Sequence, residues 1–232
     1  MSEQTPFTFK GFASGLRAGV PLAAAVLPYG VAFGALATEK GLAAETALAM
    51  SAIVHSGAAQ FAALQVWSAP PVLLTLLFAT FAMNARYLLY GALLRPHLSG
   101  LSPVRSYGAL FMMGDANWAL MMRHGQAGAL DGAFAVGTGL AMYLAWQCGT
   151  LIGAGPDYGQ GALEGFGLEF LLPIYFATMI AGLWRDAADL WPLVVGASAA
   201  VIGGGLLGAG WSIPCGVSAG LLLGSLRVRH DR

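Results

Sequence analysis

Apolar stretches long enough to cross a membrane follow one another along almost the whole chain. A helix needs about 20 mostly apolar residues to span ~30 Å of hydrocarbon. Such segments lie at residues 18–38, 46–67, 72–94, 106–122, 132–153, 166–184, 188–207 and 210–226. The sequence therefore predicts an all-α, polytopic transmembrane helix bundle of about eight spans. We expect one integral membrane domain over 1–232, with a short N-terminus at 1–17 and a basic tail at 227–232.

The balance of charge limits the partners that this chain can have. Only 9% of its 232 residues are charged and the net charge is zero, whereas soluble domains carry about 25% charged residues. Lipid must therefore solvate much of the surface. A nucleic-acid partner would need a basic stripe, which is absent. The sequence also lacks a GxxxxGK[ST] phosphate loop, so we expect no ATP-binding site, no cofactor and no metal site.

The distribution of lysine and arginine favours cytoplasmic termini. In the eight-span arrangement, the cytoplasmic side carries Lys10, Arg17, Arg123, Arg185, Arg227, Arg229 and Arg232. The opposite side carries Lys40, Arg95 and Arg105. This excess agrees with the positive-inside rule, although the loop 95–105 fits poorly. A re-entrant path for 46–67 is the alternative, and eight full spans are preferred because that alternative moves Arg123 and Arg185 outside.

Helix-breaking residues interrupt several of the segments. Pro28-Tyr29-Gly30 lies in the middle of the first span and predicts a break there, because proline removes a helix hydrogen bond. Such breaks often line the substrate site of transporters, and the alternative is a simple packing kink. The run 188–226 is too long for one crossing, and Gly208-Ala209-Gly210 offers a place to turn.

Polar side chains gather in the second, third and fourth predicted spans. They are His55, Ser56, Gly57, Gln60, Asn84, Arg86, Asp115 and Asn117. An ionisable residue at the centre of a bilayer costs at least about 2.5–3.5 kcal/mol and marks a functional site by default. We therefore expect these residues to bind substrate or couple its transport, with Tyr87 and Glu169 as further candidates. The alternative is that the charged residues only hold helices together.

Helical rise predicts which charged residues meet. Arg86 lies about 12 Å before the end of its span and Asp115 about 14 Å after the start of the next. Joined through the loop 95–105, the two residues reach the same depth, so we predict an Arg86–Asp115 ion pair. His55 lies at a similar depth and could carry a proton near neutral pH. If the chain unwinds near Gly57, free backbone groups there could bind a zwitterion.

Several motifs resemble those of the AzlC family, the large subunits of branched-chain amino-acid exporters. They are the Pro28–Ala37 stretch, the run Ser56-Gly57-Ala58-Ala59-Gln60-Phe61, Asn84-Ala85-Arg86 with Leu89-Tyr90, Asp115, and Gly167–Phe170 with Pro173. The chain departs from the family pattern at Tyr29, His55, Ala116 and Glu169. Within the resemblance, the His55 change bears most on the choice of substrate.

The resemblance implies export of valine, leucine, isoleucine or a similar neutral amino acid. It also implies proton coupling, a small multi-span partner of the AzlD type, and a place in a bacterial-type inner (cytoplasmic) membrane. A permease or channel for another small polar solute remains as an alternative. An intramembrane serine protease is disfavoured because GxSxG is absent, so we expect no enzymatic activity.

Overall fold

The computed structural model describes residues 6–98, 100–126, 130–155, 186–208 and 211–230, together with Ile174 and Ala177. Over these residues the chain is helical, as the sequence predicts. They fall into two compact units, which are described separately. The first unit comprises residues up to Gln60 and from Ala85 to Leu171, and the second comprises Phe61–Asn84 and Leu172–Arg232. Whether the two units form one domain remains a prediction.

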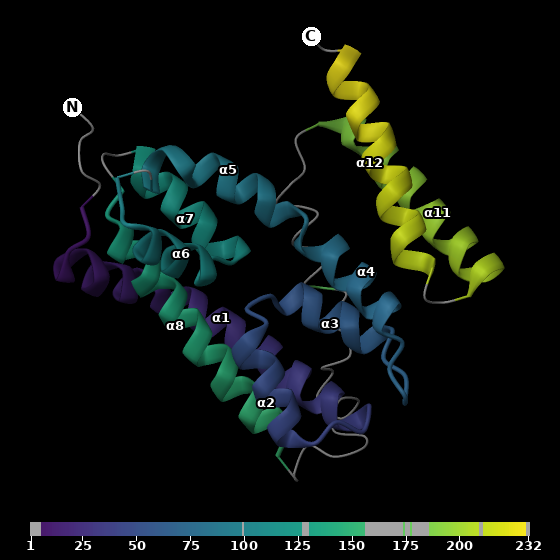
Figure 1. The fold of residues 1–232 in the computed structure, drawn as a ribbon, viewed down its shortest axis with the longest axis horizontal. Helices are drawn as coiled ribbons and strands as arrows, with labels where there is room; N and C mark the ends of the chain where they lie inside the picture. The colour runs from purple at the N-terminus through teal and green to yellow at the C-terminus, as the bar shows by residue number, and fades with distance from the viewer. Residues whose placement is uncertain are drawn as a thin grey trace. The chain divides into compact units, whose positions relative to one another are not determined.

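Two long helices, α1 (Phe9–Glu39) and α8 (Gly132–Gly153), form the core of the first unit. They run side by side in the same direction (Figure 1). Gly15 of α1 packs on Phe134 near the start of α8, and Gly34 packs on Gly153 at its end. Glycine permits this approach because a Cβ atom at either position would collide with the backbone of the other helix.

Hydrogen bonds also tie together the starting points of these two helices. The Thr8 hydroxyl donates to Asp131 Oδ2 at 2.6 Å, while Asp131 Oδ1 accepts from the Ala133 N–H of α8 at 2.9 Å. Thr8 in turn caps α1 by accepting from the Gly11 N–H. One carboxylate thus satisfies donors at both helix starts, where backbone N–H groups lack partners within the helix. We call this end of the unit the start face, and the end at Glu39 and Gly153 the far face.

The first helix corrects one expectation. α1 continues through both Pro21 and Pro28, so the predicted break at Pro28-Tyr29-Gly30 is absent. Gly30 is buried against Trp146 and Gly149 of α8, whereas Pro28 is exposed. Because the neighbouring helix packs closely along this stretch, α1 keeps its direction in spite of the missing hydrogen bond. Gly30 therefore acts in packing here.

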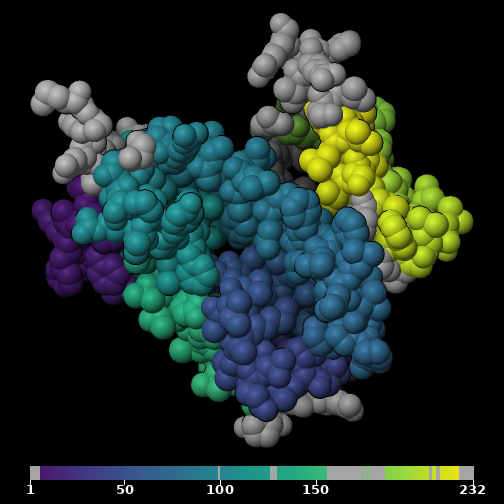
Figure 2. Space-filling model, in the orientation of Figure 1, coloured from purple at the N-terminus to yellow at the C-terminus, as the bar shows by residue number. Residues whose placement is uncertain are grey.

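The segment 103–126 forms a re-entrant hairpin, which we call hairpin B. It consists of α6 (Pro103–Phe111) and α7 (Asp115–Gln126). Leu101, just before α6, lies against Gly132 at the start face. His124, near the end of α7, stacks on Phe134 at the same face, with ring centroids 4.1 Å apart. Both arms therefore open on the start face, and α5–α7 gather beside the first half of α8 (Figures 1 and 2).

The tip of hairpin B reaches the middle of α8. Met112 lies against Gly139, and Gly114 lies near Met142. These contacts are about 10–15 Å along α8 from its start. The two arms have 9 and 12 residues, and each is shorter than the ~30 Å of hydrocarbon. The prediction of a full span at 106–122 is therefore wrong, because hydropathy counts apolar residues without recording a reversal of the chain.

The segment around residue 55 forms a second such turn, which we call hairpin A. It enters from the far face as α2 (Ala44–Ile53), and Ser51 bonds to Thr150 near the end of α8. After the break at 54–56, α3 (Gly57–Gln65) begins. Its first turn comes back beside α2, since Gln60 Nε2 donates to the Met50 carbonyl at 3.0 Å. The helix thus breaks inside 46–67, and both the preferred full span and the re-entrant alternative remain predictions.

The remaining helix of the first unit, α5 (Arg86–Leu98), ends at the start face. Its Leu94 and Leu98 are buried with Leu130 and Phe134 in one apolar cluster. The chain thus passes from the far face at α2 to the start face at the end of α5. Among the described residues, the stretches long and apolar enough to cross a membrane are Phe9–Glu39, Leu73–Leu98, Gly132–Gly153 and Ala187–Leu207.

The second unit contains α4 (Leu73–Asn84), η3 (Ala187–Asp189), α11 (Leu190–Leu207) and α12 (Ser212–His230). α11 and α12 are antiparallel, because Gly196 packs on Gly216 while Gly203 packs on Cys215. Gly208 follows α11 with φ of 100°, a conformation that glycine adopts readily. The predicted division of 188–226 into two helices, with α11 ending before Gly208, is therefore confirmed, while Ala209 and Gly210 lie outside the described residues.

The hairpin arrangement predicts which loops share a side of the membrane. In a chain with Cys148→Ser and Cys215→Ser, single cysteines at Ser102 and Arg123 should react with a membrane-impermeant maleimide from the same side. A cysteine at Lys40 should react from the opposite side. All three positions are exposed, so labelling reports their side. Eight full spans would instead place Ser102 with Lys40, and that labelling pattern would contradict hairpin B.

Candidate functional site

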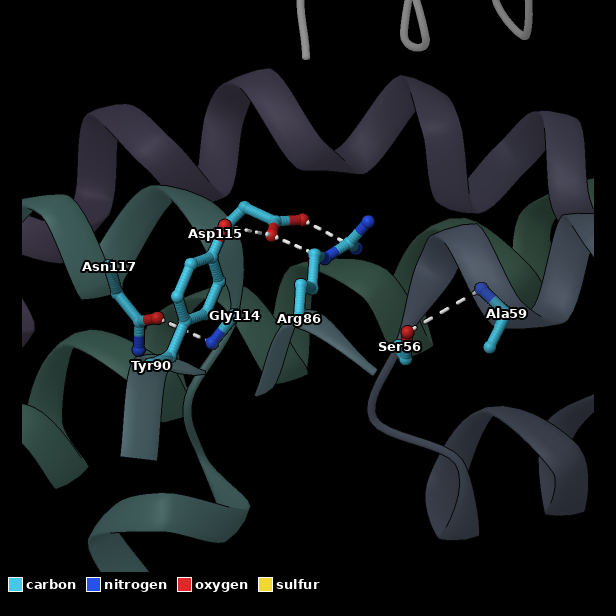
Figure 3. Close-up of polar contacts among 7 residues, drawn as sticks. All are labelled: Ser56, Ala59, Arg86, Tyr90, Gly114, Asp115 and Asn117. Carbon is cyan, nitrogen blue, oxygen red and sulfur yellow. Dashed lines mark hydrogen bonds and ion pairs between the residues drawn. The ribbon is translucent and has the colours of Figure 1, made fainter. Parts of the chain in front are cut away.

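The tip of hairpin A places a buried helix start within the first unit. Ser56 precedes α3, and its hydroxyl accepts from the Ala59 N–H at 3.4 Å, which is the position of an N-cap (Figure 3). The preceding residues Ile53 and Val54 are β-branched and lower helix propensity there. Gly57 lets α3 begin against the Trp146 ring, where a Cβ atom would lie 2.6 Å from Cη2.

Asn117 holds open the tip of hairpin B. Its Oδ1 accepts from the Gly114 N–H at 2.6 Å, and its Nδ2 donates to the Met112 carbonyl at 2.8 Å. One fully buried amide therefore satisfies backbone groups on both sides of the break. Non-helical backbone at membrane depth requires partners of this kind. Asn117, predicted as a substrate or coupling residue, is thus occupied in shaping the tip.

Gln60 and Tyr143 serve the break in hairpin A in the same way. Gln60 is fully buried and donates to the Met50 carbonyl, as described above. The Tyr143 hydroxyl of α8 donates to the Ala52 carbonyl at 3.2 Å. The Met50 carbonyl thus accepts from Gln60 in addition to the Val54 N–H, and the Tyr143 bond serves the Ala52 carbonyl at the end of α2. The sequence analysis missed Tyr143 because nothing in the pattern of α8 identifies a partner in another helix.

The predicted ion pair between Arg86 and Asp115 is confirmed. Arg86 Nε lies 2.8 Å from Asp115 Oδ1, and Nη2 donates to Oδ2 at 2.8 Å (Figure 3). The Nη2 contact is a charge-assisted hydrogen bond, which is stronger than a bond between neutral groups, and the Nε contact adds to the ion pair. The side chains keep 16% and 25% of their surface exposed. The pair is therefore largely desolvated yet accessible to a small molecule.

Aromatic residues surround the ion pair. The Tyr90 hydroxyl donates to Asp115 Oδ1 at 3.1 Å, and the Arg86 guanidinium lies over the Tyr87 ring, 5.3 Å from its centroid. In the close-up, Arg86 stands between Asp115 and Ser56 (Figure 3). Arg86 and Asp115 each begin a helix, so charged groups meet at the starts of α5 and α7. The positive end of a helix dipole favours an anion at this position.

His55 lies where the two hairpin tips meet. Its ring stacks on Phe111 of hairpin B at 6.0 Å between centroids and lies 5.4 Å from the Tyr143 ring. The predicted residues His55, Ser56, Gly57, Arg86, Tyr87 and Asp115 are thus brought together in the first unit. Asn84 ends α4 and belongs to the second unit. Glu169 lies outside the described residues.

Comparisons with known proteins identify the family of the chain. A model described as AzlC protein matches residues 21–155, which is more than half of the chain. The chain belongs to the AzlC family. It is also similar to the inner membrane protein YgaZ of Escherichia coli, with 26% identity over 97% of this chain and 94% of that protein. An uncharacterized membrane protein of Archaeoglobus fulgidus is 28% identical over 61% of each chain.

No solved structure matches this chain. The resemblance to the AzlC family proposed from the sequence is thus confirmed. AzlC proteins are a membrane transport family, so this chain is a membrane protein with a transport-type role. The match at 21–155 runs from α1 to the end of α8, which includes both hairpin tips and the Arg86–Asp115 pair.

Proposed function

We propose that this chain is the large subunit of a two-component secondary transporter that exports branched-chain or similar neutral amino acids across the cytoplasmic membrane. The observation that carries the proposal is the Arg86–Asp115 pair between the two hairpin tips. A neutral amino acid is a zwitterion. Arg86 can bind its carboxylate, and Asp115 can bind its ammonium group. A membrane site that carries both charges suits such a substrate better than an ion or a neutral polar solute.

Proton coupling forms part of the proposal. Asp115 is the member of the pair that can exchange a proton, and His55, which lies against Phe111 of hairpin B, is a second candidate. A proton and the substrate ammonium group would compete for the Asp115 carboxylate, so protonation of Asp115 from one side of the membrane would favour release of the substrate there. Opening of either hairpin would connect this site to one side of the membrane, because the tips enter from opposite faces. This arrangement supports alternating access around a fixed central site.

The distribution of charge supports a cytoplasmic start face. With both hairpins in place, Lys10, Arg17, Arg95, Arg105 and Arg123 all belong to that side, and Lys40 belongs to the other. The eight-span arrangement divides the same six residues three to each side, so the hairpins give the larger excess and remove the poor fit of the loop 95–105. The positive-inside rule then favours a cytoplasmic N-terminus. The maleimide labelling of Ser102 and Lys40, carried out on intact cells, tests this orientation.

The proposed partner is a small multi-span subunit of the AzlD type. Its surface of contact would be one of the exposed apolar helix faces. Exposed apolar side chains occur on α4, α11 and α12, among others. Lipid covers the same kind of surface, so the requirement for a partner is best tested by function.

Efflux of labelled valine and isoleucine from preloaded cells tests the proposed function. We expect saturable efflux when this chain is expressed with its small partner, and little efflux with either subunit alone. Collapse of the proton gradient should abolish concentrative efflux. The absence of efflux of either amino acid, with both chains confirmed in the membrane, would contradict the substrate assignment. Flux without saturation would instead indicate a channel.

A further inference from the structure

Tyr90 contacts the ion pair through its hydroxyl group and is fixed through its ring. The residue lies one helical turn after Arg86 on α5, so both side chains reach Asp115 from the same helix face. The Tyr90 ring stacks on Trp118 of α7, with centroids 4.4 Å apart and planes 14° apart. Trp118 in turn lies one turn after Asp115 on α7. Two adjacent contacts, Arg86–Asp115 and Tyr90–Trp118, therefore join the same pair of helices.

The Tyr90 hydroxyl and the Arg86 guanidinium bind Asp115 independently. The hydroxyl shares Oδ1 with Nε of Arg86, while Oδ2 accepts from Nη2. A carboxylate can accept about four hydrogen bonds, so neither contact excludes the other. Because the Tyr90 ring is held by Trp118 and by an edge contact with Tyr87 at 5.7 Å, its position does not depend on Arg86.

This independence matters when a substrate engages the pair. If the substrate carboxylate takes the guanidinium, Asp115 loses its main counter-charge in a largely desolvated place. A buried charge deprived of its partner is strongly unfavourable and would tend to turn away or take up a proton. A hydroxyl that stays bound to Oδ1 keeps the carboxylate in place and in its charged form. Oδ2 then faces the site, where a substrate ammonium can bind.

We infer that Tyr90 is a positioning residue that holds the Asp115 carboxylate for the substrate ammonium while Arg86 binds the substrate carboxylate. The inference rests on the proposed function, and it adds a basis for selectivity. Tyr90 makes the site prefer a zwitterion to a monocarboxylate of the same shape. The binding of a ligand without an ammonium group is not strengthened by an ordered Asp115 carboxylate.

Competition with three ligands tests this role. Valine carries both charges, isovalerate lacks the amino group, and isobutylamine lacks the carboxylate. Each is used to inhibit uptake of labelled valine into vesicles that contain the full chain and its small partner. In Tyr90→Phe, which keeps the stacked ring, we expect the inhibition constant of valine to rise about tenfold, the effect of one hydrogen bond to a charged group. The constant for isovalerate should change less than about twofold.

Two further variants separate positioning from folding. Trp118→Leu removes the surface on which the Tyr90 ring stacks. It should weaken the binding of valine more than that of isovalerate, as Tyr90→Phe does. Tyr107→Phe alters an exposed tyrosine of α6 and should leave all three constants unchanged. The inference would be overturned if Tyr90→Phe raised the inhibition constants of valine and isovalerate equally, or if it left the inhibition constant of valine unchanged. If valine does not compete even in the unaltered protein, the proposed function itself fails and the inference with it.

Discussion

Replacing Arg86 with alanine should reduce valine efflux at least about 100-fold. The change removes the group proposed to bind the substrate carboxylate and leaves the Asp115 carboxylate without its counter-charge. Removal of one partner from a buried ion pair costs about 3–5 kcal/mol. The two side chains are 16% and 25% exposed, so we expect the lower part of this range for stability. Efflux from preloaded cells and the melting temperature of the purified protein measure the two effects.

A double variant decides whether the pair binds substrate or only joins helices. Arg86→Ala with Asp115→Ala removes both charges, so no unpaired charge remains, and the melting temperature should recover most of its loss. Transport should not recover, because no group remains to bind the substrate carboxylate. Recovery of both stability and transport would mean that the pair is only a structural contact. Arg95→Ala changes an exposed arginine of the same helix and is the matched control.

The Arg86–Asp115 pair could be predicted from the sequence by counting residues from a loop. Its prediction used the residues that separate Arg86 and Asp115 from the loop 95–105 and assumed that both segments cross the membrane. Segment 103–126 turns back instead, yet Asp115 still meets Arg86. The first arm of the hairpin runs antiparallel to α5, as a spanning helix would. Counting residues from the shared loop therefore places the two side chains at the same depth, whether the segment after Asp115 continues across the membrane or turns back.

The hairpins themselves were harder to predict. Both are built from apolar residues in runs of about 20, which is also the property of a spanning helix. The signals that distinguish them are local. Gly114 with Asn117, and Ser56 with Gly57, provide a helix end and a new helix start within a few residues. The same kind of reasoning misjudged Pro28, where close packing on α8 keeps the helix intact.

The hydrogen-bond and stacking partners that side chains find in distant helices could not be predicted from a single sequence. Gln60 and Asn117 stood out because polar residues are rare in the membrane, but their partners are backbone groups at the two breaks. Tyr143 and Trp118 did not stand out, since aromatic residues are ordinary in apolar helices. Tyr90 gave two signals, namely its place in the Leu89-Tyr90 pair of the resemblance and its position one turn after Arg86 on a face predicted to be functional.

The contact between α1 and α8 should be the least tolerant part of the fold. A Cβ atom at Gly153 would overlap the carbonyl oxygen of Val31, and one at Gly15 would overlap that of Phe134. In both places the obstacle is backbone, which cannot rotate away as a side chain can. Even one added methyl group therefore pushes the helices apart along their length and opens gaps between them.

We expect Gly15→Ala and Gly153→Ala each to cost about 1–3 kcal/mol, the usual penalty for overpacking a closely packed core. The two sites lie at opposite ends of one interface, so the double variant should yield little folded protein. Size-exclusion profiles in mild detergent measure the folded fraction. Gly91→Ala and Gly108→Ala are matched controls, because a Cβ atom there meets nothing within 4 Å. These controls should gain up to about 1 kcal/mol from better helix propensity. If both pairs of variants gave the same folded fraction, α1 and α8 would not pack as described. The assignment of the start face and the far face, which is based on this packing, would then be wrong.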